Sequence, residues 1–294
     1  MSGRLLVTGA AGHLGRRVIE HLIERKAGPI IATTRDTSKI ADLATRGVEV
    51  RMADFDKPET LVTAFAGADR MLMISTDAIS APGRRLAQHK TAVAAAERAG
   101  VKHIVYTSFP APRPNSDSVI EDDHFWTEQA IAASSLSWTF MRHGLYTDGL
   151  ARFLQRALQT GTWATATQNR PRHYVTRDDC ARADAAALAS GDTSKRIYEI
   201  TGPAAPTPAE VAAIVSDVIG RQVAHVNVPA DVLRSGMEGA GLPPTVVGAM
   251  IGFDIATALG FHAIVTPAVE ELTGRAPASV RDFVTANKAA FGAA

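Results

Sequence analysis

The sequence predicts an α/β fold in which a doubly wound parallel sheet is followed by a smaller C-terminal α+β part. Short apolar runs alternate with helix-like segments over the first half of the chain, glycines cluster between the first run and the first helix, and the alternation loosens after Tyr146. Strands that are apolar throughout are typical of a parallel sheet covered by helices on both faces. These observations predict a Rossmann-type architecture.

Six apolar runs are expected to form the strands of this sheet. They span residues 4–8, 29–34, 48–53, 70–75, 102–108 and 136–142. Between them, residues 14–25 have helical spacing, and the alanine-rich segment 84–100 ends at Gly100, a favourable helix C-terminus. A sheet built from six such units has the strand order 3-2-1-4-5-6.

The chain after Tyr146 is expected to form a smaller unit that packs at one edge of the sheet and closes a cleft. Residues 160–176 are polar and rich in turn formers, and Thr207 with Pro208 opens a helix. We therefore divide the chain into residues 1–146 and 147–294, and the pattern leaves room for elements of the second part to cross back to the sheet.

The composition argues against several classes of partner. A formal net charge of +1 over 294 residues gives no electrostatic reason to expect nucleic acid or an anionic membrane. The most apolar late stretch, residues 248–269, carries Asp254 and His262, so we expect packed helix and loop rather than a membrane span. A single cysteine, Cys180, and the lack of a signal-peptide pattern before the first strand predict a cytoplasmic protein.

The glycines between the first strand and the first helix predict a dinucleotide site. A diphosphate must approach backbone N–H groups at a helix N-terminus, and side chains at the turn would block it. A three-glycine pattern alone is weak, but between the first strand and helix of a six-unit alternation it is specific. The predicted contacts are Gly9, Ala10, Ala11, Gly12, His13, Leu14 and Gly15.

The residues after the second strand predict that this dinucleotide is NADP(H). Arg35 follows the second strand and suits a ribose 2′-phosphate, whereas a carboxylate there would accept the 2′-OH of NAD. The neighbouring Asp36 leaves the second reading open, because an offset of one residue would exchange the two roles.

Four further residues stand where parallel strands end. Asp54 and Phe55, after the third strand, are placed to meet the adenine, although Asp54 equally suits the start of a turn before Pro58. Ser75 and Thr76 follow the fourth strand, at the edge where ligands of such folds bind.

Several stretches together resemble the NmrA-like group of atypical short-chain dehydrogenases, and within it the quinone, triphenylmethane-dye and azo-dye reductases. The resemblance covers nearly the whole chain. It implies NADPH along Gly9–Gly15 and Arg35, with a substrate between the 1–146 and 147–294 parts. The stretches are VTGAAGHLG, TTRD, ADF, AQHKTAVAAAERAGVKHIVYTS, HFWTEQ, WTFMRHGLYTDG, VTRDDCARADAAAL and ELTGRAPASVRDFV.

The chain departs from conventional short-chain dehydrogenases where their Tyr-x-x-x-Lys pair would stand. His124 occupies the tyrosine position and Glu128 the lysine position. Reduction of a ketone yields an alkoxide, whereas reduction of a quinone yields a phenolate that is about six pKa units less basic, or ~8 kcal/mol easier to stabilise. A cationic triphenylmethane dye needs no proton. The missing pair therefore favours quinone or dye reduction.

Three side chains are candidates to hydrogen-bond the acceptor: His124, His143 and Tyr146. For His124 the alternative is a surface pair with Glu128 at i, i+4, and for Tyr146 it is packing at the junction of the two parts. A metal site is not expected, because no third ligand has suitable spacing. Leu145, Leu150, Phe153 and Trp126 could provide an apolar slot for a flat acceptor or could simply pack the parts together.

Taken together, the sequence predicts an NADPH-dependent, flavin-independent reductase of a small aromatic electron acceptor, a quinone or a conjugated dye. The rival hypothesis is a non-catalytic NADP(H)-sensing regulator that binds a partner protein. An isomerase of the sugar-nucleotide epimerase kind ranks last, because its Tyr/Lys pair is missing. The sequence is compatible with one chain or a homodimer as the functional unit.

Overall fold

The computed structural model describes residues 3–116 and 118–292, and its centre is a seven-stranded parallel sheet. The order β3-β2-β1-β4-β5-β6 confirms the predicted arrangement, and the sheet continues with one strand that the sequence analysis did not identify, β10. Register is continuous across the centre, with Val7 opposite Ala32 on one side and Leu72 on the other. The strands are β1 (Leu5–Val7), β2 (Ile30–Thr34), β3 (Glu49–Met52), β4 (Arg70–Met73), β5 (His103–Ser108), β6 (Ser137–His143) and β10 (Arg196–Ile200).

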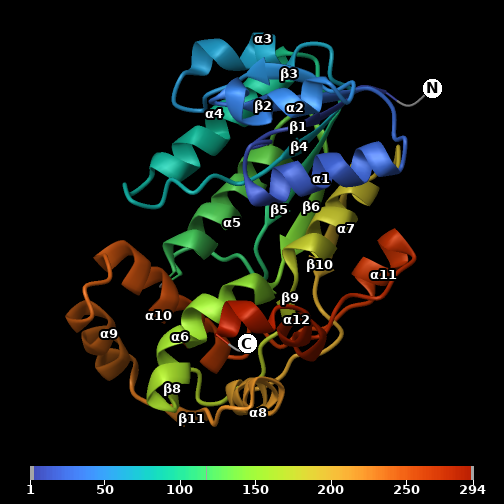
Figure 1. Ribbon diagram of the computed structural model, residues 1–294. Coiled ribbons are helices and arrows are strands. Elements are labelled where there is room, and N and C mark those ends of the chain that lie inside the picture. Colours follow the sequence, from blue (N-terminus) through green and yellow to red (C-terminus); the bar gives the residue numbers. More distant parts are fainter. Residues whose placement is uncertain (1–2, 117, 293–294) are drawn as a thin grey trace.

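Helices cover both faces of the sheet (Figure 1), as fully buried strands require. One layer contains α1 (His13–Glu24), α2 (Ala41–Ala44), α7 (Arg177–Ala189) and α11 (Ala268–Thr273). The other contains α3 (Leu61–Phe65), α4 (Arg84–Arg98) and α5 (Val119–Ala132). Short 3-10 turns, η1 (Thr37–Ile40) and η2 (Pro58–Thr60), lead into α2 and α3.

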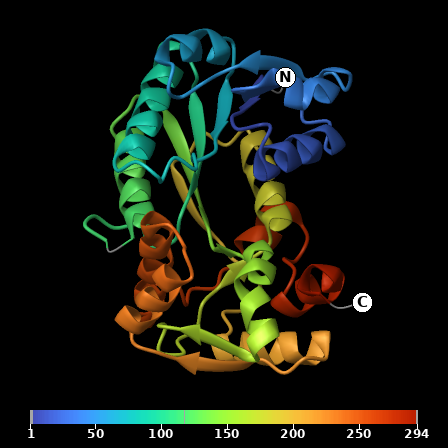
Figure 2. The same ribbon diagram turned by 60° about the vertical axis from the view of Figure 1, so that its left-hand side comes forward.

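The C-terminal part has its own apolar core below the sheet (Figure 2). Thr207 caps α8 with a capping box and Pro208 is its first residue, as the sequence predicted. The helices of this part are α6 (Leu150–Thr160), α8 (Pro208–Ile219), α9 (Ala230–Gly239), α10 (Pro244–Ala258) and α12 (Val280–Ala286), with 3-10 turns η3 (Thr147–Gly149) and η4 (Lys288–Phe291). Its two parallel ribbons pair β7 (Leu145–Tyr146) with β9 (Tyr174–Val175), and β8 (Thr162–Thr165) with β11 (Ala224–Asn227).

The chain passes between the two parts more than once. Helix α7 packs on α1, and β10 extends the sheet beside β6, although both come from the second half of the chain. The ribbon β7–β9 lies at the junction: Leu145 packs into the lower core, whereas Tyr146 packs against the α1/α7 layer. Tyr146 is thereby held beside the carboxyl edge of the sheet. Over the described ranges, no helix has the length and apolar character that crossing a membrane would require.

Candidate active site

Each of the three glycines at the start of α1 has a distinct steric reason. Gly9 adopts a φ of +61°, which is unfavourable for other residues. A Cβ on Gly15 would lie 2.4 Å from the Gly9 carbonyl oxygen, and one on Gly12 would lie 3.2 Å from the same atom. Only glycine at position 15 lets α1 begin this close to the turn.

The turn leaves an anion-binding helix N-terminus open. The N–H groups of His13, Leu14 and Gly15 have no acceptor among the described residues, and Gly12, the N-cap, has no side chain to supply one. The first turn of α1 carries no acidic residue. Backbone donors and the helix dipole therefore converge where a diphosphate would sit, and a Cβ at position 15 would disrupt this cradle. These features fit a dinucleotide.

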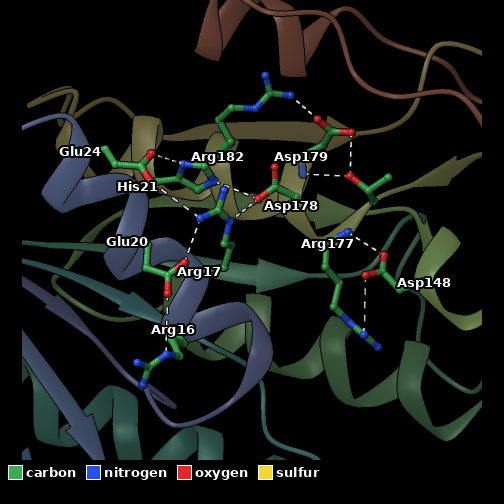
Figure 3. Close-up of polar contacts among 11 residues, drawn as sticks. Arg16, Arg17, Glu20, His21, Glu24, Asp148, Arg177, Asp178, Asp179 and Arg182 are labelled. Atoms are coloured by element: carbon green, nitrogen blue, oxygen red, sulfur yellow. Dashed lines mark hydrogen bonds and ion pairs between the residues drawn. The ribbon is translucent and has the colours of Figure 1, made fainter. Parts of the chain in front are cut away.

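Ion pairs fasten α1, and with it the glycine turn, to α7 (Figure 3). Arg17 pairs with Asp178 of α7 and, at 2.8 Å, with Glu20 of its own helix. The ring of His21 lies 3.2 Å from the same Asp178 carboxylate. The Arg17 guanidinium and the His21 ring together hold the pKa of Asp178 below its usual value against the opposing effect of burial.

The structure separates the roles of the two residues after β2. Asp36 caps η1, and its carboxylate accepts hydrogen bonds from the Ser38 N–H at 3.1 Å and the Ser38 hydroxyl at 2.6 Å. Those bonds lower the pKa of Asp36, so it is an ionised cap. Arg35 is exposed, and within the described chain its side chain makes no hydrogen bond or ion pair. Arg35 thus remains the candidate phosphate ligand at this strand end.

The other predicted strand-end residues make specific internal contacts. Asp54 accepts the Asp56 N–H at 3.1 Å, which is the turn alternative of the sequence analysis, and Phe55 packs edge-to-face on Phe65 with ring centroids 6.5 Å apart. Ser75 donates its N–H to the Thr107 hydroxyl at 2.9 Å. Thr76 donates its N–H to His89 at 3.0 Å and its hydroxyl to Gln88 at 2.7 Å. Ser75 and Thr76 both lie at the carboxyl edge of the sheet, as predicted.

His124 is a buried structural histidine rather than a free donor. Arg85 donates to its Nε2 over 2.9 Å, and because a guanidinium cannot accept, the Nδ1–H must donate to the Tyr106 hydroxyl, 2.8 Å away. Burial, and then the charge of Arg85, hold the pKa of His124 well below its usual value. The neutral ring has both nitrogens engaged, so this geometry disfavours the predicted role for His124 at the acceptor.

Glu128, at the position of the absent lysine, does not pair with His124. Arg142 of β6 binds its carboxylate with two hydrogen bonds, 2.9 and 2.7 Å long, and the Ser108 hydroxyl of β5 adds a third at 2.6 Å. The sequence alternative of a His124–Glu128 surface pair is therefore not formed. The conventional Tyr/Lys pair is thus replaced by His124 and Glu128, whose side chains bond to residues of α4, β5 and β6.

The other two acceptor candidates are joined directly. The Tyr146 hydroxyl lies 3.0 Å from Nδ1 of His143, and Nε2 of His143 lies 2.9 Å from a carboxylate oxygen of Asp184 on α7. Arg177 stacks over the Tyr146 ring at 5.0 Å. Burial, and then nearby Cys180 and Asp184, raise the pKa of Tyr146, so its hydroxyl stays protonated at neutral pH. Sequence analysis missed Asp184, which is 41 positions from His143 and carries no local motif.

Aromatic rings from three segments meet beyond the end of β5. Phe109 stacks on Phe253 of α10 with centroids 5.0 Å apart, and His262 meets it edge-on at 5.6 Å. Phe109 also stacks on His124, at 6.1 Å. Sequence analysis missed Phe109 and Phe253. The available signal was the position of Phe109, directly after a strand at the ligand edge.

The apolar residues that were expected to line a slot for the acceptor lie in the core of the C-terminal part or at the protein surface. Leu145 and Leu150 belong to the core of the C-terminal part. Phe153 and Trp126 are 49% and 42% exposed, and Trp126 contacts Phe125 edge-on. Leu145 and Leu150 are therefore packing residues, which was the alternative interpretation in the sequence analysis. Within residues 3–116 and 118–292 no group of three His, Cys, Asp or Glu side chains could hold a metal ion.

Comparison with known proteins gives consistent matches along the chain. A sequence model described as the NmrA-like family matches residues 1–259. Quinone oxidoreductase 2 of Escherichia coli is 31% identical over 87% of this chain and 88% of its own length. The NAD(P)H azoreductase of Xenophilus azovorans is 30% identical over 99% of this chain and its whole length.

Solved structures agree with these matches. The E. coli NADPH-dependent quinone oxidoreductase in complex with NADPH superimposes with a TM-score of 0.90 at 29% identity, covering 96% of this chain and 99% of that one. The triphenylmethane reductase of Citrobacter sp. gives a TM-score of 0.87 at 32% identity, covering 98% and 99%.

Proposed function

The chain belongs to the NmrA-like family, and on that premise we propose that it is an NADPH-dependent oxidoreductase that reduces a quinone or a conjugated dye without a flavin. Its relatives are named for quinone, azo and triphenylmethane reduction, at about 30% identity over most of the chain. The dinucleotide part comprises residues 1–146 together with α7 and β10, and the acceptor meets it from the remainder of 147–294.

One observation carries the choice of acceptor. The two positions that would provide a tyrosine acid and a lysine hold His124 and Glu128, and both are consumed by internal hydrogen bonds. A site without that acid is poorly suited to ketones, whose reduction yields a strongly basic alkoxide. It suits acceptors whose reduced form is a delocalised or weakly basic anion, or carries no negative charge at all.

The cofactor is held by the chain's own backbone and one cation. The open N–H groups at the start of α1 bind the diphosphate, and Arg35 binds the 2′-phosphate. When bound, the reduced nicotinamide supplies a hydride. The remaining tasks of the chain are to orient a flat acceptor and to exclude water. Tyr146 and the stacked rings of Phe109 and Phe253 are the candidates for those tasks.

The test is a panel of acceptors with the purified chain. Loss of NADPH absorbance is followed with quinones, azo dyes, triphenylmethane dyes, aldehydes and ketones, with no flavin added. We expect oxidation with at least one quinone or dye and little with simple ketones. Tyr146→Ala should weaken acceptor use while sparing NADPH binding, and Tyr146→Phe, which keeps the ring, should bind the acceptor better than Tyr146→Ala.

The panel also tests the rival function. A protein that binds NADPH but oxidises it with no acceptor would be a cofactor-sensing regulator, for which a conformational response is enough. We place the protein in the cytoplasm, because its single cysteine, Cys180, is a buried free thiol, as is common in a reducing compartment.

A further inference from the structure

A buried chain of three polar side chains ends at the carboxyl edge of the sheet, and the proposed function does not use all of it. Tyr146, His143 and Asp184 are linked in that order by contacts of 3.0 and 2.9 Å. Asp184 is fully buried and His143 is 2% exposed, whereas Tyr146 is half-buried. The chain therefore runs from a sealed carboxylate to Tyr146, which is the most exposed of the three residues.

The hydrogen-bond chemistry sets a direction. An ionised Asp184 only accepts, so Nε2 of His143 carries a proton and donates to it. The second carboxylate oxygen of Asp184 is buried and has no partner among the described residues, so the imidazole is the group that compensates its charge. The relay works from the form of His143 in which both ring nitrogens carry a proton. In that form Nδ1–H donates to Tyr146, which frees the tyrosine proton for another acceptor.

We propose that Tyr146, His143 and Asp184 form a proton relay that protonates the reduced acceptor. This proposal rests on the proposed function. In this relay Tyr146 is assigned as the catalytic residue that meets the acceptor, whereas His143 and Asp184 are positioning residues that act through it.

The step balances as follows. After the acceptor takes up a hydride, its anionic oxygen or nitrogen forms a bond to the Tyr146 proton as the tyrosine O–H bond breaks. The Nδ1 proton of His143 passes to the tyrosine oxygen at the same time. The histidine is left neutral, still donating from Nε2 to Asp184, and solvent later restores its proton. No oxidant or reductant beyond the cofactor and acceptor is needed.

The raised pKa of Tyr146 explains why a relay matters. Burial makes the isolated tyrosine a weaker acid than an ordinary phenol, so it would protonate a quinol anion unfavourably on its own. An imidazolium is ordinarily a stronger acid than a phenol, so replacement of the tyrosine proton by His143 makes the transfer favourable overall.

The discriminating experiment uses acceptors that differ in their need for a proton. An azo dye yields a nitrogen anion that is delocalised into its aryl ring but more basic than a phenolate, a quinone yields a phenolate, and a cationic triphenylmethane dye yields a neutral product. Asp184→Asn should slow azo reduction by at least about tenfold, quinone reduction less, and dye reduction not at all. Tyr146→Phe should show the same order with losses of ~10²–10⁴ for the azo dye. Melting curves and NADPH titrations show whether each variant is folded and loaded with cofactor.

The dependence on the acceptor, together with a matched control, separates the relay from a structural role. Asp192→Asn, an exposed aspartate after the far end of α7, should leave all three rates unchanged. The titratable and charged groups that face the relay are Cys180 and Arg177 of α7, Asp148 of η3 and His124 of α5.

The failures differ in pattern. If Asp184→Asn slows azo, quinone and triphenylmethane reduction equally, the relay is refuted while the proposed function stands. If the unaltered protein reduces none of the three acceptors, the proposed function fails, and the relay fails with it for want of an anion to protonate.

Discussion

Replacement of Arg35 by alanine tests the cofactor assignment. Arg35 is exposed at the end of β2, and the neighbouring carboxylate that would favour NADH, Asp36, is already bonded to Ser38. A charge-assisted hydrogen bond contributes about 1.5–3 kcal/mol, which corresponds to roughly ten- to a hundredfold in affinity. Because the site is open to solvent, we expect the lower half of that range at ordinary salt.

The assay is a fluorescence titration of the protein with NADPH and with NADH. The unaltered protein should prefer NADPH, Arg35→Ala should remove most of the preference by weakening NADPH binding alone, and the preference should shrink as salt is raised. Arg46→Ala removes an equal charge before β3, at the opposite edge of the sheet, and should change nothing. Equal binding of NADH and NADPH by the unaltered protein, or an Arg35→Ala variant that keeps the preference, would refute the assignment.

Three further predictions concern the fold around the site. Gly15→Ala places a Cβ 2.4 Å from the Gly9 carbonyl oxygen, so in thermal melts it should lower the free energy of unfolding by about 1–3 kcal/mol, and it should abolish most NADPH binding. Gly248→Ala, in open space on α10, should be neutral or stabilising in the same melts. A Gly15→Ala variant that binds NADPH normally would contradict the proposed diphosphate cradle. His124→Phe should lower quinone turnover by less than ~10²-fold but lower the free energy of unfolding by about 1–3 kcal/mol. A larger loss of turnover with unchanged stability would make His124 a proton donor. Burial lowers the pKa of His103 to about 4, so on acidification the unfolded state binds the proton first and the stability should fall as pH drops from ~6.5 towards 4. Melts of His103→Gln should show a smaller loss of stability over this pH range. A stability difference between the two proteins that does not change with pH would contradict this prediction.

Local patterns were sufficient for the architecture, and they indicated the glycine turn that we propose holds the diphosphate. Apolar strands that alternate with helices specify a parallel sheet wherever they occur, and the order of the first six strands followed from that rule. The short half-exposed strand β10 was missed, because "RIYEI" stands alone in a polar stretch and gains its partner only from β6. Asp36 caps the turn after β2 through a bond across two residues, a signal that lay within reach of the sequence, and this leaves Arg35 as the proposed phosphate ligand.

The acceptor side depended on contacts between distant residues. The sequence placed His124 on the helix after the fifth strand and His143 and Tyr146 at the end of the sixth, but it could not show which groups their side chains would meet. His124 is engaged by Arg85, 39 positions away, and His143 by Asp184, 41 positions away. Whether a buried imidazole donates, accepts or relays a proton depends on what its two nitrogens meet. Periodicity assigns a side chain to a face of an element, but only the packing of β6 against α5 and α7 decides which atoms meet there.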